Sequence, residues 1–412
     1  VLKAGETQLG PTDHSGRGDA DGDGDGLHAL FEKLAREPGL LVDLLTAFSS
    51  MQVMQRQVLA LLQLFPFQQQ AVEILVDLNT CDAIYGIALR HPTNVQLCSE
   101  CIKTLTHFAE LSPTYRRVVC EDAPLQSLLH LLEKHERRAG DSPFFVTNCF
   151  DLVIQACRDS ADSQAKFAAT RFSLKLFNYL ENHSEDVAAI TSACDVVKAM
   201  CEDGDLSNLE QYFTRKYLAL YHRVLAQSCT NRLAVRPVYF VLMMAARCTG
   251  PYANYFATEL VQSDAVDFLV RILEREEQHR QSASVCYLLL VLTCTYLLTV
   301  PALIPLVLRA NMAGILSQYA DALMWNKNVH QAASHCLRIL HSWAKTRESS
   351  VDLENTPLPL GDLLDSSSVG RGSGGGGGGA DNLMLGSLAF DDSVSVLTND
   401  ASDFNANHHH HH

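Results

Sequence analysis

The sequence lacks the signatures of the common enzyme classes. It has no G-x-S-x-G nucleophile elbow, no P-loop, no H-E-x-x-H zinc motif and no glycine fingerprint after a strand. The glycine run from Gly374 to Gly379 lacks the Lys and Ser/Thr that a phosphate-binding loop needs. We therefore expect a protein that is not an enzyme and has no cofactor.

A basic surface is also missing, although the formal net charge of the chain is −15. Six acids against two bases give residues 1–26 a charge of −4, and nine acids against one base give residues 350–407 a charge of −8. The body between them is close to neutral. Because binding to phosphate backbones needs concentrated positive charge, we expect no nucleic-acid partner.

A disulfide framework and a secretory signal peptide are not apparent either. The thirteen cysteines have no regular spacing, and several of them, such as Cys149, Cys157, Cys194 and Cys286, lie within apolar helical runs. Such cysteines are typical of small buried side chains in a reducing compartment. This usage predicts a cytoplasmic protein.

The sequence does contain a repeated helical pattern from Leu27 to about Lys345. In residues 95–111 the apolar side chains follow three- and four-residue spacing, and Asn94 is a typical helix start. Successive runs of this kind are centred about 42 to 50 residues apart. The predicted helices are Val95 to Leu111, Phe144 to Arg158, Glu185 to Cys201, Arg232 to Arg247, Ser282 to Leu298 and Asn328 to Lys345.

Further helices of each unit are predicted before the first of these runs and between the others. Every unit then has an apolar face that only a neighbouring unit can cover, as in a solenoid. The intervening helices are predicted at Ala71 to Arg90, Pro124 to Arg138, Ala161 to Asn182, Leu206 to Ser228, Pro251 to Glu277 and Leu303 to Ala322.

This period and helix pattern resemble the armadillo and HEAT repeat families over residues 27–346, in six or seven units. The resemblance implies an all-α, right-handed α-solenoid that acts as a protein-binding scaffold or adaptor through the last helix of each unit. The Trp and Asn array of the importin-α type is missing, which argues against recognition of nuclear signals. Residues of the corresponding helices here are Lys103, Asp195, Tyr239, Arg338 and a single tryptophan, Trp343.

Polar residues off the apolar stripes of these helices are the candidate contacts for a protein partner. A solvated surface would explain each of them equally well. The candidates are Lys103, His107, Asn148, Gln155, Lys198, Tyr239, Arg247, Arg338 and His341.

The two ends of the chain have compositions typical of disorder. Residues 1–26 are acidic, residues 347–380 form a Ser/Gly-rich linker that is either natural or engineered, and residues 408–412 are a His tag. Residues 381–407 mix acidic and apolar side chains, and are either a solvated tail or a linear motif. The motif hypothesis makes this segment an intramolecular ligand of the groove, through Leu385, Leu388, Phe390, Asp391 and Asp392.

Two other functions stay open. Residues 21–32 match the spacing of an EF-hand loop, which would make the protein a calcium-responsive adaptor, although His28 replaces the usual aliphatic residue. Residues 283–308 carry no charge and are long enough to cross a membrane, which would make it a membrane-anchored scaffold. Pro301 and Pro305 argue against a continuous membrane helix.

Other residues with metal-binding potential have simpler explanations. Cys98 and Cys101 lie on an apolar helix face without a second pair at zinc-finger spacing, so we expect core packing. His330, His335 and His341 share one predicted helix and are expected to be exposed. The sequence predicts no metal site.

Overall fold

The computed structural model describes residues 29, 32–64, 69–136, 143–203, 205–275, 283–321 and 327–348. These ranges are helical, without any β-strand. Seven of the helices, called the third helices below, recur at the predicted period. They are α3 (Gln52–Leu64), α6 (Val95–Leu111), α9 (Pro143–Cys157), α12 (Val187–Cys201), α15 (Arg232–Arg247), α19 (Ala283–Thr299) and α22 (Lys327–Glu348).

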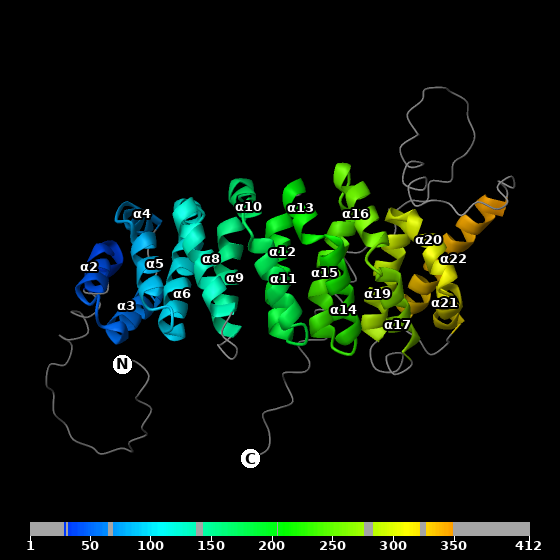
Figure 1. The fold of residues 1–412 in the computed structure, drawn as a ribbon, viewed down its shortest axis with the longest axis horizontal. Coiled ribbons are helices and arrows are strands. Elements are labelled where there is room, and N and C mark those ends of the chain that lie inside the picture. Colours follow the sequence, from blue (N-terminus) through cyan, green and yellow to red (C-terminus); the bar gives the residue numbers. More distant parts are fainter. Residues whose placement is uncertain are drawn as a thin grey trace, which may run out of the picture. The chain divides into compact units, whose positions relative to one another are not determined.

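The third helices form a ladder in chain order. Each one packs against the next, from α3 on α6 through to α19 on α22, and the units follow one another in the same order in Figure 1. In such an array the apolar face of a unit is covered by its neighbours rather than by a central core. The predicted all-α, armadillo-like solenoid is therefore confirmed.

Each interval between third helices contains two shorter helices where the sequence predicted one. Most of the units thus have three helices, as in armadillo repeats, rather than the two of HEAT repeats. The first helices of these units are α4 (Gln69–Asp77), α7 (Pro113–Val119), α10 (Ala161–Ala168), α13 (Leu206–Tyr212), α16 (Pro251–Val261) and, in the last unit, η1 (Pro301–Leu303) with α20 (Ile304–Arg309). The second helices are α2 (Gly39–Ala47), α5 (Thr80–Arg90), α8 (Asp122–Glu136), α11 (Phe172–Asn182), α14 (Arg215–Gln227), α17 (Ala265–Glu274) and α21 (Met312–Asp321).

Three of the five missed breaks, those before α5, α17 and α21, have a local cause. Asn79, Asp264 and Asn311 adopt positive φ values of 52°, 58° and 56°, immediately or shortly before α5, α17 and α21 begin. A left-handed residue ends a helix, and Asn and Asp are the non-glycine residues that tolerate this conformation best. Since neither Gly nor Pro marks these turns, the apolar periodicity runs across them.

Capping residues set the starts of several third helices. The side chain of Asn94 accepts a hydrogen bond from the Leu97 amide at 3.0 Å, and that of Asn231 accepts one from the Leu233 amide at 3.1 Å. Such caps satisfy backbone donors that have no partner within the helix. The predicted bounds of α6 and α15 are confirmed to the residue.

The core consists of the apolar stripes of these helices. On α6, the predicted face that includes Cys98, Cys101 and Leu105 is fully buried. None of the thirteen cysteines, all of which lie in the described residues, forms a disulfide, and every one except the partly exposed Cys248 is buried. Their interpretation as core residues rather than a disulfide framework is confirmed.

Side chains also bond across the seams between units. The Thr104 hydroxyl donates to the Leu59 carbonyl at 3.2 Å, the Tyr255 hydroxyl to the Glu210 carbonyl at 2.8 Å, and the Tyr319 hydroxyl to the Leu273 carbonyl at 2.9 Å. Each bond joins residues 45 or 46 positions apart, which is one repeat. These bonds fix the register of one unit on the next, because a shifted register would deprive the buried Thr104 and Tyr319 hydroxyls of these acceptors.

The apolar stretch at 283–308 is divided at the predicted place. Helix α19 ends at Thr299, and most of its side chains are buried between neighbouring helices. Among the described residues no single helix is both long and apolar enough to cross a membrane; α19 meets the criterion only together with Pro301–Arg309, across a bend of 108°.

One buried polar pair links two units. His222 on α14 lies 2.6 Å from the Leu218 carbonyl through Nδ1 and 3.1 Å from the Tyr296 hydroxyl of α19 through Nε2. This arrangement uses the neutral ring, with Nδ1–H donating and Nε2 accepting. Burial, partly opposed by the bond to Leu218, lowers the pKa of His222 to about 4.

The core assignment predicts that Leu105→Asp will destabilise the protein by more than about 4 kcal/mol, because an unpaired charge would enter a fully buried site. Urea denaturation followed by circular dichroism measures the loss. The matched control is Gln96→Asp on the exposed side of the same helix, where a change within about 0.5 kcal/mol is expected. Equal stability of the two variants would contradict the assigned face.

The lowered pKa of the buried His222 predicts that the free energy of unfolding depends on pH. Between pH 6.5 and about 4 the unfolded chain binds a proton at this residue and the folded chain does not, so the free energy of unfolding falls as the pH falls, by up to about 3 kcal/mol. Denaturation midpoints of wild type and His222→Phe across this range test it. The variant loses that part of the slope, whereas His130→Phe at an exposed position keeps it.

Candidate functional site

The third helices share one uncovered stripe, called the third-helix face below. Each ladder helix is packed by its ladder neighbours on two sides and by the other helices of its unit behind. On α6 the remaining stripe includes Gln96, Lys103 and Glu110, which are exposed at helical spacing. This face is where the polar candidates were predicted.

A pocket of about 230 Å³ lies on this face where α3, α6 and α9 meet. It brings three of the predicted residues together, Lys103, His107 and Asn148. The sequence did not single out its other lining residues, which are Gln63, Thr106, Glu110 and Asp151.

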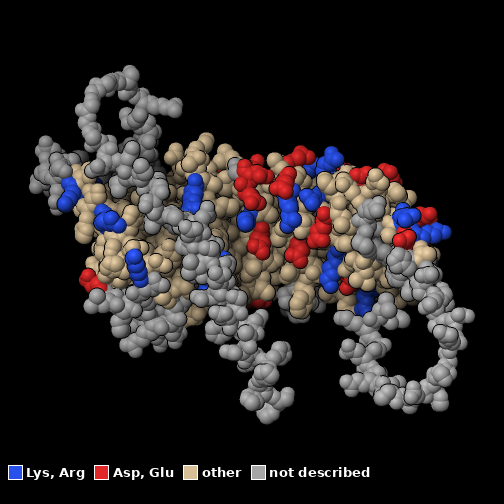
Figure 2. All heavy atoms as spheres, turned by 180° about the vertical axis from the view of Figure 1, so that it is seen from behind, with Lys and Arg blue, Asp and Glu red and all other residues tan. Residues whose placement is uncertain are grey.

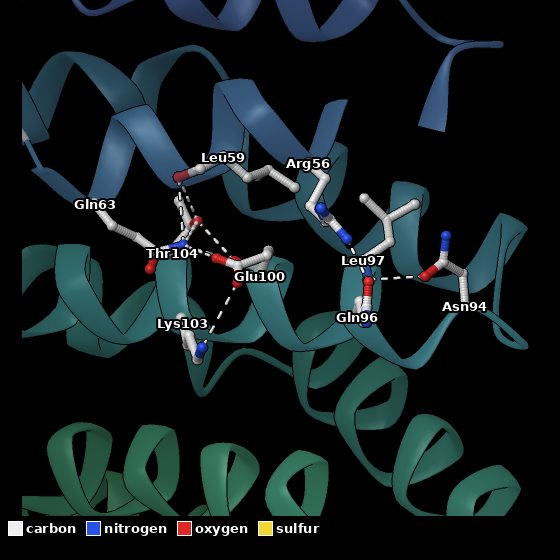
Figure 3. A network of polar contacts seen from close by, with 9 residues as sticks. All are labelled: Arg56, Leu59, Gln63, Asn94, Gln96, Leu97, Glu100, Lys103 and Thr104. Carbon is white, nitrogen blue, oxygen red and sulfur yellow. Dashed lines mark hydrogen bonds and ion pairs between the residues drawn. The ribbon is translucent and has the colours of Figure 1, made fainter. Parts of the chain in front are cut away.

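A polar network holds one wall of the pocket in place (Figure 3). The amide of Gln63 on α3 donates to the Glu100 carboxylate at 2.7 Å and to the Thr104 hydroxyl at 3.1 Å. The same carboxylate pairs with Lys103 at 3.5 Å, although Lys103 is about half exposed. An exposed pair of this kind adds little stability but orients its partners. Lys103 therefore lines the pocket with its ammonium group paired to the Glu100 carboxylate, which orients the side chain.

Carboxylates dominate the next part of the face. Burial, then the charges of Asp195 and Glu110, raise the pKa of Asp151. Burial also raises the pKa of Asp195 on α12, while the nearby Lys198 opposes the rise. Ionised carboxylates in this setting are stabilised by any positive group that approaches them.

The charge changes sign along the ladder. On the face seen in Figure 2, Asp and Glu gather over the middle units, whereas Lys and Arg predominate toward the C-terminal units at the left. The third helices follow the same order, with Asp151 and Asp195 on α9 and α12 and with Arg236 and Arg247 on α15. Positive charge therefore lines only part of the face.

The remaining predicted residues lie further along the ladder. Gln155 is half-buried on α9, and Arg247 is exposed at the end of α15. Arg338 and His341 are exposed on α22, where the Arg338 guanidinium donates to the His335 ring at 3.2 Å. These positions share the face with the pocket but are not among its lining residues.

Tyr239 was predicted on the wrong side of α15. It is only 6% exposed, and burial raises its pKa to about 12, with Arg247 opposing the rise. The adjacent Phe240 takes the outward position and is 41% exposed. The physical reason is the 100° rotation between successive helical residues, which the apolar sequence of α15 leaves ambiguous.

Helix α15 carries a proline in its interior at the same face. Pro237 has no N–H, so the Leu233 carbonyl lacks the donor that residue i+4 ordinarily supplies. Leu233 itself is 70% exposed. The helix thus presents a backbone acceptor beside two exposed apolar side chains.

The metal hypotheses find no support in the described part of the chain. No group of three or more His, Cys, Asp or Glu side chains is arranged to hold an ion there. Cys98 and Cys101 are buried, as predicted for core residues. The EF-hand-like loop, apart from Ala29 and Glu32, and the linear-motif residues Leu385 to Asp392 lie outside the described residues.

Comparison with protein-family models finds no match, and no curated protein matches. Among solved structures, a designed armadillo repeat protein is similar at 16% identity and a TM-score of 0.43, over 60% of this chain and 94% of its own. An engineered protein is similar at 13% identity and a TM-score of 0.34, over 76% of this chain and 91% of its own. The fold assignment rests on the helix order and packing described above.

Pro237→Ala should stabilise the protein by about 1 to 3 kcal/mol, because it restores one backbone hydrogen bond and removes the clash of the proline ring. Thermal and chemical denaturation measure the gain. Pro251→Ala is the control, since Pro251 lies at the start of α16, where proline is well accommodated. A loss of stability in Pro237→Ala would show that the proline ring contributes packing that outweighs the missing bond.

Proposed function

We propose that this armadillo-type solenoid is a non-enzymatic scaffold that binds an extended segment of a partner protein along its third-helix face. The observation that carries the proposal is the pocket on α3, α6 and α9, where polar side chains from three successive units converge on a surface that their own units leave uncovered.

The chemistry of the face fits a polypeptide ligand. An extended chain presents a backbone donor and acceptor at every residue, and side-chain amides such as Gln63 and Asn148 offer both. Exposed carboxylates at Asp151 and Asp195 add charge selectivity. Repeated units supply such groups at regular intervals, which suits a long ligand better than a compact one.

The proposal includes an occupant from the same chain, the segment from Ala380 to Phe404. Its Leu385, Leu388 and Phe390 lie among Asp and Ser residues, a composition typical of motifs that bind partners. Deleting residues 380–407 and measuring hydrogen exchange on the third helices tests this version. If exchange is unchanged and the synthetic segment does not bind, the intramolecular version is wrong, and the ligand is a segment of another protein.

The main test is photo-cross-linking in the full chain. A photoreactive amino acid at Thr106, which lines the pocket, is expected to capture partner peptides that the same group at exposed Ala169 does not. Asp195→Lys should weaken the capture of basic partner segments at least tenfold, or about 1.4 kcal/mol, because it reverses the charge of this part of the face. Glu210→Lys on α13 makes the same charge change away from the third helices and should leave capture intact.

The proposal fails if Thr106 and Ala169 capture the same proteins, or if Asp195→Lys and Glu210→Lys reduce capture equally. Circular dichroism of both variants establishes that any loss reflects binding rather than folding.

A further inference from the structure

We propose that the outer face of α15 is the anchoring subsite of the third-helix face, and that it takes a segment in which an apolar side chain is adjacent to carboxylates. This subsite, called the α15 patch, consists of Leu233, Arg236, Phe240 and the Leu233 carbonyl. The inference rests on the proposed function and specifies the chemistry of the ligand.

The α15 patch exposes apolar surface. Leu233 is 70% exposed and Phe240 is 41% exposed, and their seven-residue spacing places them on the same side of the helix. Aromatic side chains with partly exposed faces are enriched at the energetic centres of protein interfaces. Covering these two side chains with a ligand removes apolar area from water, which favours binding.

A guanidinium is held against this apolar surface. The Arg236 Cζ atom lies 5.5 Å from the centre of the Phe240 ring, a cation–π distance, and the arginine is half-buried. The stacked ring occupies one face of the guanidinium and leaves its in-plane N–H groups for a carboxylate, which Arg binds in bidentate fashion. An apolar contact and a carboxylate contact therefore lie side by side.

The third component is the backbone acceptor created by Pro237. Because the Leu233 carbonyl lacks its ordinary helical donor, a ligand N–H has an acceptor within the patch. Pro237 is expected to destabilise α15. The same proline leaves the Leu233 carbonyl available to a ligand donor, so the loss of stability is linked to binding. The patch thus combines an aromatic anchor, a cation and an acceptor within two helical turns.

The neighbouring unit sets where an acidic segment fits. Asp195 on the adjacent α12 and Asp151 beyond it repel carboxylates, whereas Arg236 attracts them. The change from red to blue along the face in Figure 2 shows the same order. An acidic-apolar segment is therefore favoured at α15 and disfavoured over α9 and α12, and a basic segment has the opposite preference.

The probe is a fluorescent peptide of residues 383–397, in which Phe390 precedes Asp391 and Asp392. The recipient is the full chain with these three residues changed to Ser, so that its own copy does not compete. Fluorescence anisotropy should show saturable binding. Phe240→Ser and Arg236→Glu should each weaken it at least tenfold, whereas Phe144→Ser, at an exposed aromatic of α9, should change it less than twofold.

A second peptide with Asp391→Lys and Asp392→Lys is the ligand control and should bind at least tenfold more weakly to the same recipient. Absence of saturable binding, equal effects of Phe240→Ser and Phe144→Ser, or tighter binding of the lysine peptide would each overturn the inference. Because capture at Thr106 does not depend on this peptide, loss of peptide binding with intact capture rejects only the α15 patch. Loss of both rejects the proposed function as well.

Discussion

The structure depends on the inability of one unit to bury its own apolar face. A three-helix unit of about 45 residues presents apolar stripes on two sides, and only the units before and after it remove both from water. Side-chain bonds across the seams, such as those from Tyr255 and Tyr319, place donors on the carbonyls of the preceding unit. Register and burial therefore reinforce each other, and the third-helix face follows from the same stacking.

The sequence predicted the ladder because its signals are local. Asn94 and Asn231 cap their helices, and the bounds of α6 and α15 were predicted to the residue. On α6 the apolar spacing also identified the buried face. The divisions before α5 and α17 were missed, because Asn79 and Asp264 turn the chain within an apolar pattern that continues. Backbone conformation at a single residue leaves no periodic signal.

The site was less accessible to prediction than the fold. The sequence analysis identified Lys103, His107 and Asn148 as polar residues off the apolar stripe. That they line one pocket depends on how α6 and α9 are rotated relative to each other. Glu110 and Asp151 were not among the candidates, although both are polar residues that line the pocket. The prediction that Tyr239 faces outward was wrong for a different reason. Tyr239 and Phe240 are adjacent aromatics in an apolar helix, so the sequence does not decide how α15 is rotated.

The buried thiols have a consequence for how the opening of the array can be followed. Alkylating reagents attack the thiolate, and burial raises the pKa of thiols such as Cys101, Cys157 and Cys201. These residues belong to different units, and Cys336 belongs to the last one. The order in which the cysteines become alkylated therefore reports which units separate first. Peptide mass spectrometry identifies each alkylated position without any introduced label.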